Sequence, residues 1–295
     1  MGKHISHMSI SWLIIGGSLL TAGCANLAAV KGYSDETKKL TASFEPMLSG
    51  SVAACEDRYV RDALFTHRQF NLAEERKNAD ELCSPIKTAN EVIAPLNTLL
   101  AAYADTLLAL ADDKLPSYKG ELDGLSKALG SVKKLNGEAV LEAKQLTAVN
   151  ALAEYVSRMA TQRIQVNAIK EALGHHESIS TIAEILKDYA TRNYGGYIND
   201  QLREFPTIVE AVRTHAQSEM LASRYLEVQL AADKSALEEK KKAIDSYVAA
   251  VDKMVAAHKD LADHVDQLDA PERLKLIAAY AKEVYALQKQ VQQAF

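Results

Sequence analysis

The sequence predicts an all-α protein, built as an elongated antiparallel helical bundle with long, coiled-coil-like helices. Alanine, leucine, lysine, glutamate and glutamine fill the chain, which has only 13 glycines and six prolines in 295 residues. No segment alternates apolar and polar residues with the period of two that a half-buried strand requires. Apolar residues recur instead at steps of three and four, the spacing of one helix face.

Two segments extend this spacing into the heptad pattern of coiled coils. The first run of apolar positions is Val149, Leu152, Val156, Met159, Val166 and Leu173. The second run is Leu237, Ile244, Val248, Val251, Val255, His258, Ala262 and Val265. No glycine or proline occurs between Thr207 and Leu268, and an unbroken helix over that range would be about 90 Å long. We therefore expect shorter helices to pack along it.

In the first half of the chain, caps and prolines set the expected helix boundaries. Helices are predicted over 35–82, with a break near the Pro46–Gly50 segment. Ser84 is predicted to cap the next helix, which has a proline in its first turn, is kinked at Pro95 and runs to about Asp113.

In the second half, the turn at 115–117 and the Asn136-Gly137 pair separate helices predicted over 118–135 and 138–173. Gly174 is expected to close the second of these. The last helix is predicted to begin at Asp269-Ala270-Pro271-Glu272, where the aspartate acts as cap. The helical domain is thus expected over 35–295, and a division into sub-bundles 35–135 and 136–295 stays open.

The N-terminal residues have the three regions of an export signal. Lys3 is basic, Ile10 to Leu20 are mainly apolar, and Thr21-Ala22-Gly23 supplies small residues before Cys24. This stretch resembles the lipobox of bacterial lipoproteins, although Thr21 stands where that family prefers leucine. An ordinary cleaved secretory signal is the alternative, and the apolar run is too short for a membrane-spanning helix.

The resemblance implies that residues 1–23 are a signal peptide and that Cys24 is lipidated and becomes the first mature residue. Residues 24–34 would then form a tether. Ala25 follows the cysteine, and in such lipoproteins an aspartate there marks retention in the inner membrane. The resemblance therefore implies an outer-membrane protein, lipid-anchored and facing the periplasm.

Cys55 and Cys83 are the remaining cysteines of this exported chain, and we predict that they form a disulfide. The alternatives are two buried thiols or a metal pair, although neither cysteine has a second ligand at zinc-site spacing. The formal net charge of −5 excludes the basic surface typical of nucleic-acid binding and a polybasic lipid-binding patch.

Catalytic motifs are missing from the sequence. There is no Gly-x-Ser-x-Gly elbow, no phosphate-binding glycine loop and no haem-attachment motif. Ser-x-x-Lys occurs at Ser84–Lys87 and Ser131–Lys134, but the partner motifs of serine acyl-transferases do not. We expect neither enzymatic activity nor a cofactor.

The histidines offer no metal site by spacing. His258 occupies a seam position and is expected to be buried and hydrogen-bonded, with a pH-sensitive contact as the alternative. The pair Asp260 and His264 is expected to be a solvated acid–base pair. His175-His176-Glu177 follows a helix C-terminus, which favours histidine, and the alternative is a small acid–base or metal cluster.

One segment departs from the plain helical background, because aromatic residues gather around the double glycine Gly195-Gly196. Tyrosine and arginine are frequent in protein-binding hot spots, and the alternative is a helix corner filled by tyrosines. The candidate partner-binding residues are Tyr189, Arg192, Tyr194, Tyr197 and Phe205.

These observations favour a non-catalytic, membrane-anchored helical lipoprotein that binds an envelope protein, as a scaffold, adaptor or immunity-type protein does. The alternative is a periplasmic small-molecule-binding or sensory bundle, with the ligand between helices near Val92 to Leu110. An enzyme ranks below both.

Overall fold

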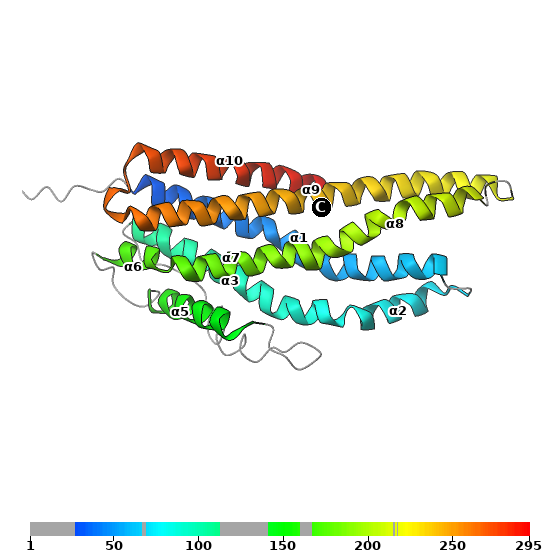
Figure 1. Cartoon of the computed structure of the whole chain (residues 1–295), viewed down its shortest axis with the longest axis horizontal. Helices are drawn as coiled ribbons and strands as arrows, with labels where there is room; N and C mark the ends of the chain where they lie inside the picture. The colour runs from blue at the N-terminus through cyan, green and yellow to red at the C-terminus, as the bar shows by residue number, and fades with distance from the viewer. Residues whose placement is uncertain (1–26, 67–68, 113–140, 160–166, 215, 217) are drawn as a thin grey trace, which may run out of the picture.

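A computed structural model describes residues 27–66, 69–112, 141–159, 167–214, 216 and 218–295 (Figure 1). All regular secondary structure in these ranges is helical, which confirms the all-α prediction. The helices are α1 (Ala28–Thr66), α2 (Leu72–Leu82), α3 (Ser84–Ala111), α5 (Ala143–Met159), α6 (Ala168–Gly174), α7 (His176–Asp188), η1 (Tyr189–Tyr194), α8 (Gly195–Thr214), α9 (Met220–Asp263), η2 (Val265–Gln267) and α10 (Pro271–Ala294).

Several predictions fall outside the described residues. They concern the signal peptide over 1–23, the lipidation site Cys24, the turn at 115–117 and the helix at 118–135 with its Ser131–Lys134 pair.

The long helices α1, α9 and α10 follow the longest axis of the molecule (Figure 1). α1 packs against α2 and α3 on one side and against α8, α9 and α10 on the other. α7 lies between α3 and α9, and α5 packs on α3 and α7. α1 therefore contacts helices from both halves of the chain, and buried residues of both halves belong to one hydrophobic core.

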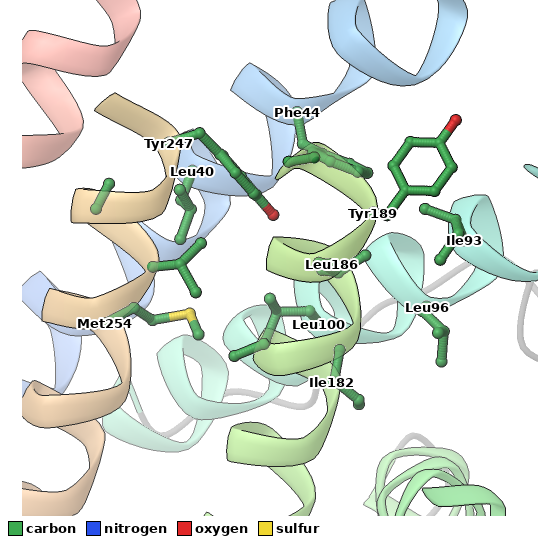
Figure 2. Packing of buried hydrophobic residues seen from close by; sticks show 14 of the residues in the cluster. Leu40, Phe44, Ile93, Leu96, Leu100, Ile182, Leu186, Tyr189, Tyr247 and Met254 are labelled. Carbon is green, nitrogen blue, oxygen red and sulfur yellow. The ribbon is translucent and has the colours of Figure 1, made fainter. Parts of the chain in front are cut away.

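The core is made of apolar side chains from helices that are distant in sequence (Figure 2). Phe44 of α1 stacks on Tyr247 of α9, with ring centroids 4.9 Å apart, and also meets the edge of Tyr189. Residues from α3 and α7, including Leu96 and Leu186, fill the space beside these rings. Burial of this apolar surface is the main stabilising contribution to the fold.

The predicted break near Pro46 is wrong, because α1 continues through this residue to Thr66. Leu40 and Phe44 before the proline and Met47 after it are fully buried. Packing on both sides thus outweighs the lost backbone hydrogen bond that makes proline unfavourable inside a helix. α1 also begins at Ala28, so residues 28–34 are helical, whereas the sequence suggested a tether.

Both predicted N-caps differ from the structure by one residue. Cys83, not Ser84, is the cap residue of α3, and Ala270, not Asp269, is the cap residue of α10. Neither helix has a side-chain cap hydrogen bond. The prolines at the second position of α3 and the first of α10 remain compatible with helix starts, since their missing N–H has no partner there in any case.

Cys55 of α1 and Cys83 at the α2–α3 corner lie at disulfide-bonding distance, with Cα atoms 6.0 Å apart, as predicted. Both side chains are fully buried. The link ties the α2–α3 corner to the middle of the longest N-terminal helix.

The long segment after Thr207 is divided. α8 ends at Thr214, and α9 begins at Met220 and runs for 44 residues. Among the described helices, α3 alone has the length and apolarity to cross a membrane, but 61% of its most apolar stretch is buried inside the protein. Such burial is typical of the core helix of a folded domain.

Candidate functional site

The double-glycine segment is helical. Tyr189–Tyr194 form a π-helical stretch that leads directly into α8 at Gly195. A Cβ atom on Gly195 would lie 2.8 Å from the carbonyl oxygen of Ala190. Glycine is therefore needed here for close backbone packing within the helix, and not for a bend in a loop.

Three of the five candidate partner-binding residues lie in the core: Tyr189, Tyr194 and Phe205. The Tyr189 hydroxyl donates to Oδ1 of Asn90, and burial raises the pKa of Tyr189 to about 12. Arg61 stacks over the Phe205 ring at 4.8 Å. These contacts correspond to the alternative in which tyrosines fill a junction between helices.

Arg192 and Tyr197 reach the surface. Together with Pro85 and Asp200 they line a small cavity of about 270 Å³ between the start of α3 and the start of α8. The Arg192 guanidinium is paired with Asp188 at 2.7 Å and is otherwise open to solvent. Of the five candidate partner-binding residues, only Arg192 and Tyr197 are thus accessible to a partner.

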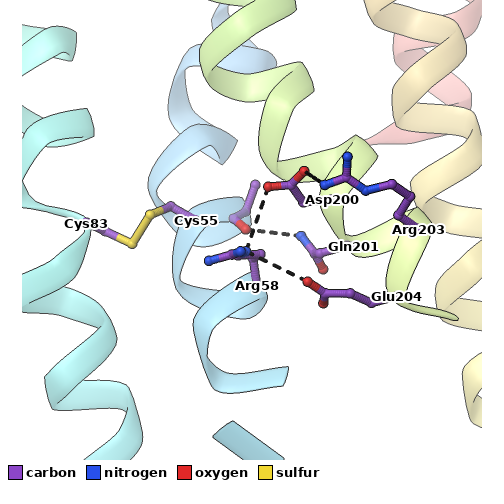
Figure 3. Close-up of polar contacts among 8 residues, drawn as sticks. Cys55, Arg58, Cys83, Asp200, Gln201, Arg203 and Glu204 are labelled. Carbon is purple, nitrogen blue, oxygen red and sulfur yellow. Dashed lines mark hydrogen bonds and ion pairs between the residues drawn. A yellow bond between two sulfur atoms is a disulfide. The ribbon is translucent and has the colours of Figure 1, made fainter. Parts of the chain in front are cut away.

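A polar network beside the disulfide joins α1 to α8 (Figure 3). Nε of Arg58 lies 3.9 Å from carboxylate oxygens of both Asp200 and Glu204. Gln201 donates to the carbonyl oxygen of Ala54 at 3.0 Å. Burial raises the pKa of the Glu204 carboxyl, and Arg58 opposes that shift. Two ion pairs and one hydrogen bond thus position α8 on α1, although Nε of Arg58 makes no hydrogen bond among the described residues.

Three histidines come together where α3, α7 and α9 meet. His258 is fully buried, and its Nε2 lies 2.6 Å from the Tyr103 hydroxyl, which donates to the carbonyl of Ala172 at 3.0 Å. A hydroxyl has a single proton, so Nε2–H of His258 is the donor to Tyr103. Nδ1 of His258 is then an acceptor, and Nδ1–H of His176 donates to it at 3.1 Å.

This chain of hydrogen bonds is complete only when His258 is neutral. Burial, followed by the neighbouring His176 and His175, lowers the pKa of His258 to about 3. His258 is fully buried, as its seam position predicted. Burial also lowers the pKa of His175 and of His176.

The pair Asp260 and His264 lies apart from this histidine cluster, at the end of α9. Nδ1 of His264 lies 3.3 Å from a carboxylate oxygen of Asp260, as expected from their spacing. Nε of Arg273 lies 3.2 Å from the other carboxylate oxygen of Asp260. Lys87 of the first Ser-x-x-Lys pair is ion-paired with Asp80. Within the described ranges, no group of three histidine, cysteine, aspartate or glutamate side chains is placed to hold a metal ion.

Sequence reasoning missed a different surface, where α1 ends and α2 and α9 begin, at the right of Figure 1. Large apolar side chains there are between 38% and 83% exposed, and three of them, Leu64, Phe65 and Leu226, line one groove. Large exposed apolar surface of this kind is unusual on a folded domain. We call this surface the apolar end: Leu64, Phe65, Phe70, Leu72, Met220, Leu221, Tyr225, Leu226 and Val228. The spacing of Leu221, Tyr225 and Val228 on one helix face was the available signal.

A groove opens into the apolar end between α1 and α9, with α8 at its floor. We call it the α1–α9 groove, and its cavity volume is about 630 Å³. Its apolar walls are Val60, Leu64 and Phe65 of α1 and Leu226, Leu230 and Leu237 of α9.

Four charged side chains also line the α1–α9 groove: Asp57, Arg61, Asp233 and Lys240. Nη2 of Arg61 lies 3.4 Å from Asp233, whereas Nε of Arg61 is buried without an acceptor. Lys240 has no acidic partner among the described residues. The groove is therefore largely apolar, and among the described residues one buried donor that lines it, Nε of Arg61, has no acceptor.

No protein-family model matches the chain, and no curated protein or solved structure is significantly similar to it.

Proposed function

We propose that this protein is a non-catalytic lipoprotein, anchored through Cys24 to the periplasmic face of the outer membrane, that binds another envelope protein. The observation that carries the proposal is the apolar end with its groove. Contiguous exposed apolar surface on a folded domain is typical of a binding site for another protein. Scaffold, adaptor and immunity-type roles all belong to this class, and the acidic chain offers no surface for nucleic acid.

The position of the apolar end fits an anchored protein. α1 begins four residues after Cys24, and its 39 residues extend for about 58 Å toward the apolar end. An acylated Cys24 would therefore place the apolar end far from the membrane. The elongated antiparallel bundle with coiled-coil-like helices predicted from the sequence belongs to this proposal, and the packing of α10 along α9 supports it.

A small-molecule-binding role is the second candidate, because a cavity of about 630 Å³ is of the size that ligand sites have. The site would differ from the one considered from the sequence. Val92, Leu96, Leu100 and Leu107 of α3 are packed in the core, and the cavity lies between α1, α8 and α9.

The anchor is tested by Cys24→Ser. Without a thiol to acylate, the protein is expected to leave the membrane fraction or to keep its signal peptide, because the acidic chain has no polybasic patch to hold it on anionic lipid. Fractionation followed by intact-mass measurement checks both. Unchanged membrane attachment together with unchanged processing would contradict the anchor.

Partner binding is tested by placing a photocrosslinking phenylalanine analogue at Tyr225 in living cells. Tyr285 of α10 provides a matched control, since both are tyrosines on helix surfaces and are 68% and 71% exposed. We expect a discrete protein adduct from position 225 and none from position 285. Equal adducts from both positions, or no protein adduct from position 225, would remove the proposed function.

A further inference from the structure

The α1–α9 groove is the continuation of a groove that already holds a helix. α10 packs against both α1 and α9. The Tyr280 hydroxyl of α10 donates to Thr37 of α1 at 3.2 Å, and Cε1 of Phe295 lies 3.3 Å from the Cβ position of Gly50. Nζ of Lys240 lies 5.9 Å from the centre of the Phe295 ring. Lys240 thus marks the point where α10 stops covering the groove and the open part begins.

Beyond this point α8 packs against both α1 and α9 (Figure 1), and the groove that opens there is lined only by residues of these three helices. The open part follows α9 from Lys240 to Leu226, about 21 Å or four helical turns. Its apolar walls come from the same two helices that accept α10, and α8 forms its floor.

From this continuity we propose that the α1–α9 groove binds an amphipathic α-helix of the partner protein, lying in line with α10. The proposal rests on the proposed function and names the form that the partner takes at this site. Over four turns, such a helix places large apolar side chains at steps of three and four against the walls.

The walls also disfavour an extended peptide. Strand addition needs free backbone N–H and C=O groups on the receiving edge. α1 and α9 are continuous helices over the groove, so their backbone groups are already paired within each helix. Affinity must then come from side chains, which a helix presents on one face.

The charged side chains of the groove indicate which charged side chains the bound helix should carry beside its apolar face. Two acids and two bases line it, so neither a strongly basic nor a strongly acidic segment is favoured overall. Asp57 and Lys240 have no ion-pair partner among the described residues, and the buried Nε of Arg61 has no acceptor. A helix with both a carboxylate and a basic side chain beside its apolar face would satisfy these groups.

The test uses two photocrosslinker positions, Gln229 and Ala236, which line the groove on one face of α9 and are seven residues apart. We expect both to attach to one segment of one partner protein. The attachment sites should be about seven residues apart, because two helices lying side by side advance equally along their axes. An extended segment over the same distance would give about three residues.

Leu226→Glu is expected to reduce the yield of both adducts about tenfold or more, because it places a charge on the apolar wall. Leu274→Glu is the matched control: it makes the same change at a leucine of α10 that is 39% exposed, against 45% for Leu226, and that belongs neither to the apolar end nor to the groove. We expect it to leave the yield unchanged. Both variants should keep the melting temperature of the unmodified protein, since both side chains are open to solvent.

Attachment to a second copy of this chain, to a lipid or small molecule, or to a partner segment with strand-like spacing would overturn the proposal. So would equal effects of the two glutamate variants. Adducts from Tyr225 without adducts from Gln229 and Ala236 would leave the proposed function standing and remove the helix. An absence of protein adducts from all three positions would remove both.

Discussion

Replacing Tyr194 with alanine is expected to lower the free energy of unfolding by about 3–5 kcal/mol, as truncation of a large buried aromatic residue does. The side chain is fully buried and stacks near Phe295, with ring centroids 6.3 Å apart. Removing it leaves a cavity between the N-terminus of α8 and the end of α10. Urea unfolding at constant pH measures the loss.

Tyr194→Phe is the matched control for this cavity. The Tyr194 hydroxyl is buried and has no hydrogen-bond partner among the described residues. Removing an unpaired polar group relieves its desolvation penalty, so the phenylalanine variant should be at least as stable as the unmodified protein. Arg192→Ala, on the surface of the same segment, should change stability by no more than about 0.5 kcal/mol. Full stability of Tyr194→Ala would mean that the ring does not pack in the core.

Lowering the pH from about 6.5 to about 3 is expected to cost stability through His258. In the folded protein its pKa is about 3, whereas an unfolded histidine has a pKa of about 6.5. Between these values the unfolded chain binds a proton that the folded chain does not. The stabilising contribution is thus fully present above pH 6.5 and is lost as the pH falls through this window, by on the order of 4–5 kcal/mol.

His258→Gln separates this histidine from the carboxylates that titrate at similar pH. Glutamine does not titrate and can still bond to the Tyr103 hydroxyl. The free energy of unfolding of the variant should therefore fall less steeply between pH 6.5 and 4 than that of the unmodified protein. His175 and His176 keep their own lowered pKa values, so part of the slope remains. Identical slopes in the two proteins would show that His258 does not carry the effect.

Local pattern was sufficient for the features that depend on helix periodicity. The step of three and four residues in the second heptad run predicted a helix face, and Leu237, Ile244, Val251 and His258 of that run are buried in α9. Compartment and cysteine number together predicted the Cys55–Cys83 pair, whose two side chains come together across the α1–α3 packing.

Local rules failed where packing between distant segments decided the outcome. Pro46 usually interrupts a helix, but burial of its neighbours against α3 and α9 keeps α1 continuous. Gly195 suggested a corner between helices, whereas its missing side chain allows close backbone packing next to Ala190 inside a continuous helical segment. The local sequence around Pro46 or Gly195 does not show whether the helix continues there, because that depends on the side chains and backbone that pack against it.

The candidate site shows the same division. Aromatic composition drew attention to Tyr189 and Tyr194, but composition does not reveal which side of a helix faces the core, and both are buried. The apolar end combines the end of α1 and the start of α2 with the start of α9, which begins 154 residues after α1 ends. Only their meeting in space makes single apolar residues into one surface.

By itself, the sequence determined that this chain forms helices and which residues have helical faces to bury, because those properties depend on neighbours a few residues away. It also supplied the lipobox-like segment that predicts a membrane anchor. Tertiary structure decided which apolar faces found partners. α10 covers the groove between α1 and α9 only as far as Phe295. The open remainder exists because two helices extend beyond the third, a relation between lengths and positions that no local pattern records.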